Sequence, residues 1–263
     1  MHRRGITLTV LSILTGAAAF FLRKRELNTI FDEATGLAQK NAPITLALAG
    51  LVLVMILVAL IIAATFKAED GSKISYGSAF GGKSMIWLVI AFLMCMGQMF
   101  ASVAYCLSSG FKSMSVFEMV FAALGVLGGI AYLMTAVFAF KGNGEGACGF
   151  FSSLLAIFFA VWMVISFRDR AADPVIIDYV YKCLALGASA LAMCSGAGFA
   201  FGNNKTRRTL WFSFAAVVLS CVALADDLEL YEQIWLICAL LANMINMGML
   251  SRREWTKSST AQE

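Results

Sequence analysis

Residues 44–66 read ITLALAGLVLVMILVALIIAATF, and this stretch contains no charged side chain. It is long enough to cross the hydrocarbon core of a bilayer as a helix, which takes about 20 residues. A helix is the expected form because it satisfies every backbone amide within its own segment, where lipid offers no hydrogen-bond partner. Pro43 precedes the run, at a position where the first turn of a helix tolerates a missing N–H group. The stretch therefore predicts one membrane-spanning helix.

Seven further apolar runs have comparable lengths, and short polar connections separate them. The outer-membrane barrel alternative needs short segments of alternating hydrophobicity, and the sequence contains none. We therefore predict an all-α integral membrane protein, a bundle of about eight transmembrane helices. The predicted spans are Gly5–Leu22, Ile44–Phe66, Met85–Leu107, Val116–Phe140, Gly149–Phe167, Val175–Phe201, Leu210–Ala225 and Ile234–Leu250.

The composition of the whole chain agrees with this prediction. Of the 263 residues 60% are apolar and 14% are charged, and the mean hydropathy is +0.82. A soluble domain carries roughly 25% charged residues, so a soluble globular enzyme and a disordered chain are both excluded. We expect one transmembrane domain over residues 1–251 and a short polar cytoplasmic tail over residues 252–263.

The first apolar run has two readings. Its basic start and small residues suit a secretory signal peptide, but the run continues to Leu22 and stops at Arg23-Lys24-Arg25. That basic cluster resembles a membrane boundary, which favours an uncleaved span.

The distribution of charge predicts the orientation. With eight spans, 12 of the 20 basic residues and 5 of the 16 acidic residues lie on the side of the termini. The positive-inside rule then places both termini in the cytoplasm, and we expect the membrane to be the plasma membrane. The last outer connection is acidic, with Asp226, Asp227, Glu229 and Glu232. It is either a solvated loop that suits a helix N-terminus, or a mouth that attracts cations or docks a partner.

The first outer connection has the composition of a tight turn over Phe31–Leu37, where Asp32 opens the turn and Gly36 closes it. A helical continuation of the first span is the competing structure. At Arg23–Leu37, followed by Pro43, the chain resembles uncharacterised multi-pass membrane proteins of anaerobic Gram-positive bacteria. The resemblance covers about 50 residues and implies no activity.

Similar residues at the ends of the spans also suggest a weak repeat of two halves with four spans each. The first and fifth spans both end in Phe and basic residues, and the second and sixth both begin after proline.

Known chemical motifs are nearly absent from the chain. Residues 77–84 read GSAFGGKS, which matches the phosphate-loop pattern, but the segment that follows is a predicted transmembrane span instead of a helix of a nucleotide-binding domain. His2 is the only histidine, so haem and zinc sites that need histidine ligands are disfavoured. The seven cysteines include no CxxC pair and are expected to pack as small apolar residues. We predict no catalytic residue, no cofactor and no metal.

Polar residues within apolar spans are the default candidates for function. Asp178 and Lys182 are four residues apart and would face together near the outer end of the sixth span. They form either an interfacial pair, with Lys182 reaching toward water, or a solute contact in an outer vestibule. The complete set of candidate vestibule or solute contacts is Asp178, Lys182, Glu118, Gln98, Asn243 and Asn246.

Small residues predict how the helices pack. The fourth span contains Gly125 and Gly129, four residues apart, and the sixth contains a stripe at the same spacing. Such stripes let two helix backbones approach closely, so we expect these two spans to be neighbours. The stripe of the sixth span consists of Ala188, Ala192, Gly196 and Ala200.

Two functions remain open from sequence, and the first of them is the one we predict. The first is a non-catalytic membrane component, such as a scaffold, a sensor or a subunit of an envelope assembly. The second is a transporter or channel for a small solute or cation, with an acidic outer mouth. A polar cavity between the third, sixth and eighth spans would favour transport, whereas a solid interior would favour a partner. The expected surroundings are the lipid bilayer and either a membrane-protein partner or a second copy of the chain, with no nucleic acid.

Overall fold

In the computed structural model, every regular element among the described residues is a helix. The described residues are 2–30, 42–66, 75–81, 85–110, 114–142, 144–170, 179–203 and 205–260, with the backbone alone for 2–6, 169 and 252–260. The elements in these ranges are α1 (His2–Ile30), α2 (Pro43–Ala64), α3 (Tyr76–Phe80), α4 (Met85–Ser109), α5 (Val116–Lys141), α6 (Glu145–Arg170), α7 (Val180–Ala197), the short 3-10 helix η2 (Gly198–Phe201), α8 (Thr206–Ala223) and α9 (Leu230–Thr260).

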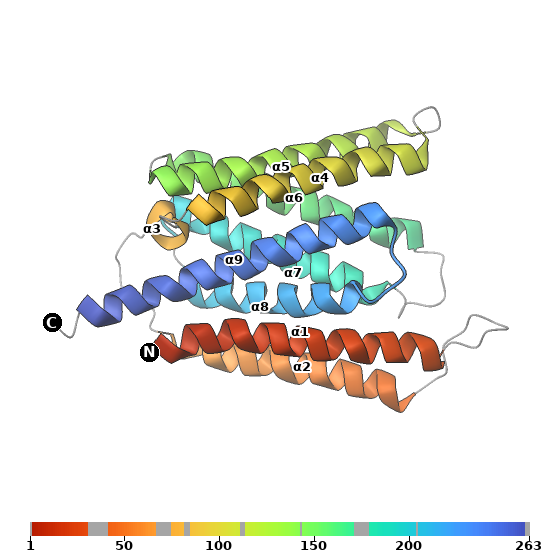
Figure 1. The fold of residues 1–263 in the computed structure, drawn as a ribbon, viewed down its shortest axis with the longest axis horizontal. Helices are drawn as coiled ribbons and strands as arrows, with labels where there is room; N and C mark the ends of the chain where they lie inside the picture. Colours follow the sequence, from red (N-terminus) through yellow and green to blue (C-terminus); the bar gives the residue numbers. More distant parts are fainter. Residues whose placement is uncertain are drawn as a thin grey trace.

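The long helices lie side by side and run alternately in opposite directions, so that both termini lie at the same end of the bundle (Figure 1). We call this the terminal end. The opposite end holds the junction between α8 and α9, and we call it the acidic end after the residues Asp226, Asp227, Glu229 and Glu232.

Seven of the described helices are long and apolar enough to cross a membrane, one fewer than the eight expected from sequence. The helix that falls outside this group is α8. Its first turn carries Arg207 and Arg208, which lower the hydropathy of an 18-residue helix. Most of α8 is also enclosed by protein, since 13 of its 18 residues are buried.

The contacts between helices divide the bundle into two parts. In the first part, α5 packs between α4 and α6, α6 packs against α7, and α9 contacts both α4 and α7. These five helices therefore enclose a common interior. In the second part, α1 packs against α2, α8 and α9, and α8 lies between this group and α7 (Figure 1).

Two helix boundaries extend beyond the apolar runs. The first helix continues eight residues past Leu22, to Ile30, and so extends beyond the predicted end of the first span. Residues 31–41, where the tight turn was expected, lie outside the described residues. The last helix continues to Thr260, through most of the stretch expected to be a tail.

The suggested repeat of four plus four spans is not reflected in the packing. In that repeat, α7 and α8 are the second and third spans of the second half. Their counterparts in the first half are α2 and α4, which should then pack as closely as α7 and α8 do. Within the described ranges, α2 instead packs against α1 and α8, with no substantial contact to α4.

The glycines of α5 pack closely, but against a different helix from the one expected. A methyl group added at Gly129 would lie 3.1 Å from the backbone oxygen of Cys95 on α4. One added at Gly125 would collide with the Ser102 side chain, also on α4. The expectation that this notch receives the sixth span was therefore wrong, because α5 packs against α4 and α6.

The small-residue stripe lies on α7, a helix that packs against α6 and α8. Ala188, Ala192 and Gly196 are buried, and Ala200 falls in η2 at intermediate exposure. Around Gly196 the fit is looser than around the α5 glycines, since the nearest atom to an added methyl group belongs to Phe80 at 3.8 Å.

Candidate functional site

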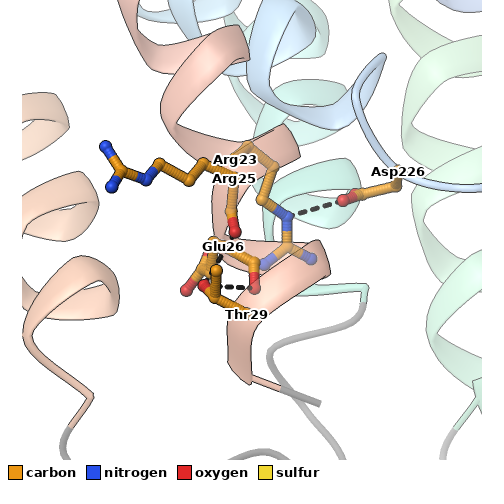
Figure 2. A network of polar contacts seen from close by, with 5 residues as sticks. All are labelled: Arg23, Arg25, Glu26, Thr29 and Asp226. Carbon is orange, nitrogen blue, oxygen red and sulfur yellow. Dashed lines mark hydrogen bonds and ion pairs between the residues drawn. The ribbon is translucent and has the colours of Figure 1, made fainter. Parts of the chain in front are cut away.

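A buried ionic cluster joins α1 to the junction of α8 and α9 at the acidic end (Figure 2). Arg23 Nε donates a 2.7 Å hydrogen bond to Asp226 Oδ1, and Arg23 Nη1 donates a 2.8 Å bond to Glu26 Oε2. The arginine side chain is 0% exposed, and both carboxylates are buried. The guanidinium also lies 5.2 Å from the ring centre of Tyr181 on α7. One side chain thus ties α1 to two other parts of the bundle.

This cluster corrects the interpretation of Arg23 as a membrane-boundary charge. Because α1 continues through residue 30, Arg23 and Glu26 lie one turn apart on one helix face, and that face points into the protein. Lys24 and Arg25 are exposed, and Arg25 points away from Asp226 in Figure 2. Of the three consecutive basic residues, only Arg23 therefore takes part in the buried cluster.

A second ion pair connects α7 with α9. Lys182 Nζ donates a 2.8 Å hydrogen bond to Glu232 Oε1, and both side chains are largely buried. Asp178, the partner expected from sequence, lies outside the described residues. With the Arg23 cluster, this pair engages two of the four carboxylates of the acidic end, Asp226 and Glu232.

A cavity of about 200 Å³ opens beside Lys182 and Glu232. It is lined by charged groups that balance in sign and by four aromatic side chains. Its principal lining residues are Tyr105, Phe121, Trp162, Ser166, Arg170, Lys182, Glu229, Tyr231 and Glu232. They come from α4, α5, α6, α7 and the start of α9. We call this the acidic-end cavity.

A second cavity, of about 50 Å³, lies between the same five helices toward the terminal end. Its walls also include α3, which contributes Tyr76 and Phe80. Burial raises the pKa of the Tyr76 phenol, so its hydroxyl stays neutral at physiological pH. Its polar lining residues are Tyr76, Tyr132, Thr135, Ser152 and Asn246. We call this the terminal-end cavity.

A cluster of aromatic rings borders the acidic-end cavity, and two of its rings, Phe158 and Trp235, lie on α6 and α9 between the lining residues of the two cavities. The central ring is that of Trp235, which is 0% exposed and lies 5.2–5.9 Å, between ring centres, from five other rings. These six residues form what we call the ring cluster: Tyr105, Phe121, Phe158, Trp162, Tyr231 and Trp235. On α6 the nearest lining residues of the two cavities, Leu155 and Trp162, are separated by about 10 Å of helix.

Gln98, a sequence candidate, lies beside the ring cluster. Its backbone oxygen accepts hydrogen bonds from Trp235 Nε1 at 3.4 Å and from Ser102 Oγ at 2.9 Å. Its side chain is buried, and the amide nitrogen Nε2 has no hydrogen-bond partner among the described residues. A buried donor without an acceptor costs about 1 to 3 kcal/mol, so this group calls for an explanation.

The other candidates are dispersed. Glu118 is half-buried and forms a capping box with Ser115 at the start of α5. Asn243 is buried, and its Nδ2 donates an interhelical bond to Ser189 Oγ of α7 at 3.2 Å and a bond to the Ala239 oxygen of its own helix at 2.8 Å. Asn246 lines the terminal-end cavity. The structure thus places Lys182, Gln98 and Asn246 at three levels of one five-helix interior.

The phosphate-loop match has a packing explanation. Residues Tyr76–Phe80 form a short helix, and a methyl group at Gly77 would lie 3.2 Å from the Cα atom of Gly142. At Gly81 it would meet the Gly77 and Ala139 carbonyl oxygens. These glycines allow α3 to pack against the end of α5. The remaining motif residues, 82–84, lie outside the described residues.

Comparison of the chain with protein-family models, with curated proteins and with solved structures found no match.

Proposed function

We propose that the chain is a transporter of the plasma membrane that carries a small polar solute through the interior of α4, α5, α6, α7 and α9. The observation that carries this proposal is the pair of cavities, which lie within the same five-helix interior, one toward each end of the bundle. The ring cluster between them would be the closed barrier of the path. The unpartnered Gln98 amide lies at that barrier, where it can donate a hydrogen bond to a passing solute.

The proposal includes an eighth span and an orientation. We infer that α8 also crosses the membrane, shielded from lipid by α1, α2, α7 and α9. Eight crossings agree with the two termini at one end of the bundle (Figure 1). The basic residues of that end then place both termini in the cytoplasm.

The acidic outer mouth expected for a cation pathway has less support. Asp226 and Glu232 are engaged with Arg23 and Lys182, so their negative charge is largely balanced. The lining of the acidic-end cavity has two basic and two acidic residues. A neutral or zwitterionic solute therefore suits this site better than a metal cation does.

The competing function is a non-catalytic membrane component, and one observation favours it. Trp235, at the centre of the ring cluster, is 0% exposed, which would suit a rigid scaffold without any path. The two functions differ in whether the centre ever opens.

Uptake by proteoliposomes tests the proposal. The purified full chain is reconstituted, and the entry of labelled urea, glycine and N,N,N-trimethylglycine is followed with and without imposed sodium and proton gradients. We expect at least one solute to enter faster than in protein-free liposomes, and Gln98→Leu to slow that entry. If no probe enters faster under any gradient, the non-catalytic component is the better reading.

A further inference from the structure

The acidic-end cavity combines aromatic walls with balanced charges. Four of its lining residues are aromatic, namely Tyr105, Phe121, Trp162 and Tyr231. We propose that this cavity binds a small zwitterion that carries a methylated ammonium group and a carboxylate. This inference rests on the proposed function, and it names the class of solute.

The aromatic walls account for the methylated ammonium group. The methyl groups of such an ammonium do not donate strong hydrogen bonds. A site made only of polar groups therefore cannot bind it selectively. The faces of Trp, Tyr and Phe rings attract it through their quadrupoles. All four rings that line the cavity belong to the ring cluster, where edge-to-face and tilted contacts with Trp235 hold them in place. The site is therefore organised before any ligand binds.

The charges account for the carboxylate. Lys182 and Arg170 contribute two positive charges to the lining, and Glu229 and Glu232 contribute two negative ones. A ligand with one charge of each sign leaves this balance unchanged, whereas a simple cation or anion would disturb it. The carboxylate would lie toward Lys182 and the first turn of α9, where the helix dipole favours negative charge.

The volume sets the size of the ligand. Cavities that bind drug-sized molecules have volumes of roughly 300 to 1,000 Å³, and this one has about 200 Å³. It suits a solute of few heavy atoms. N,N,N-trimethylglycine is the simplest molecule with both groups, and it is the probe we would use.

Binding to the detergent-solubilised full chain can be measured with labelled trimethylglycine by scintillation proximity. Unlabelled glycine lacks the methyl groups, and choline lacks the carboxylate, so the two competitors test the two halves of the proposal. We expect saturable binding, with each competitor about tenfold weaker than trimethylglycine. Equal competition by glycine would overturn the role of the rings, and equal competition by choline would overturn the role of the basic residues.

A matched pair of variants tests the rings directly. Tyr231→Leu should weaken the binding of trimethylglycine about tenfold, whereas Tyr231→Phe, which keeps the ring, should bind nearly as well as the parent. Phe201→Leu removes an exposed ring outside the cavity and should leave binding unchanged. Size-exclusion profiles establish that each variant is folded. Tight binding by folded Tyr231→Leu would overturn the proposal.

The outcomes separate this inference from the proposed function. Proteoliposomes that take up urea or glycine but not trimethylglycine would leave transport standing and remove the methylated zwitterion as its solute. Saturable binding of trimethylglycine without uptake under any gradient would support the site and contradict transport.

Discussion

Arg23 on α1 donates a 2.7 Å hydrogen bond to Asp226, a residue 203 positions later at the junction of α8 and α9. The pair is buried together with Glu26, and the guanidinium faces the ring of Tyr181 (Figure 2). A buried ion pair is weak evidence for net stabilisation, because removing two charges from water offsets much of their attraction. It does make the position of α1 specific, since any displacement of α1 leaves a buried charge without its partner.

Replacing Arg23 alone should therefore be costly. Arg23→Met leaves Glu26 and Asp226 buried without their counter-charge, and we expect a loss of about 3 to 5 kcal/mol in the free energy of unfolding. The matched control is Arg25→Met, which changes an exposed arginine two positions away and should stay within about 0.5 kcal/mol. Thermal unfolding in detergent measures both variants.

A triple variant separates charge from packing in this cluster. Neutralising both acids in the Arg23→Met background, with Glu26→Gln and Asp226→Asn, removes the uncompensated charges and should recover part of the lost stability. If Arg23→Met is as stable as Arg25→Met, the cluster does not hold α1 in place.

Gln98 offers a test in which stability and function move in opposite directions. Gln98→Leu removes a buried donor that has no partner among the described residues, so we expect stability to rise by about 1 kcal/mol. Solute entry into proteoliposomes should fall, because the barrier loses the group proposed to bind the solute. A loss of stability together with unchanged entry would contradict both expectations.

Asn243 is the control for Gln98, because its side-chain amide nitrogen is hydrogen-bonded. Asn243→Leu breaks the bonds to Ser189 and to the Ala239 oxygen, and it should cost about 1 to 3 kcal/mol. The same thermal unfolding assay compares the two variants. If both variants change the unfolding temperature by similar amounts, the hydrogen bonding of the amide does not determine the effect of replacing it.

The sequence predicts the helices well where an apolar run ends at polar residues. The runs that begin at Met85 and Val116 correspond to α4 and α5 within two residues. The prediction falls short where charged residues continue a helix, as Arg23 and Glu26 do in α1. A hydropathy profile places the end of a span at such residues, because it contains no information on the ion-pair partners that allow a charged side chain to be buried.

The candidate site could be predicted only in part, for a similar reason. Lys182 was identified by its position in an apolar span, but local spacing suggested Asp178, and the structure pairs Lys182 with Glu232, 50 positions away. Arg23 and Asp226 were each visible in the sequence as members of charged clusters. Nothing in a single sequence links two residues whose contact depends on the packing of α1 beside α8.

The eighth span can be tested at the two ends of α8. In a background without native cysteines, Asn203→Cys and Asp227→Cys place exposed thiols before and after this helix. If α8 crosses the membrane, a membrane-impermeant thiol reagent added outside intact cells should label position 227 and not position 203. In the same way it should label Glu229→Cys and not Ser258→Cys. Labelling of positions 203 and 227 from the same side would exclude an eighth crossing.

The glycines of α5 and α7 should differ in their tolerance of a single methyl group. Gly129→Ala places a Cβ atom 3.1 Å from the Cys95 backbone oxygen, and this oxygen cannot move without shifting α4. We expect a loss of about 1 to 3 kcal/mol in the free energy of unfolding. At Gly196 the nearest neighbour is Phe80 at 3.8 Å, an ordinary contact, so Gly196→Ala should gain up to about 1 kcal/mol from its better helix propensity. Thermal unfolding of the two variants under one detergent condition decides the matter. If Gly129→Ala is as stable as Gly196→Ala, the close approach of α5 to α4 is not a constraint on the fold.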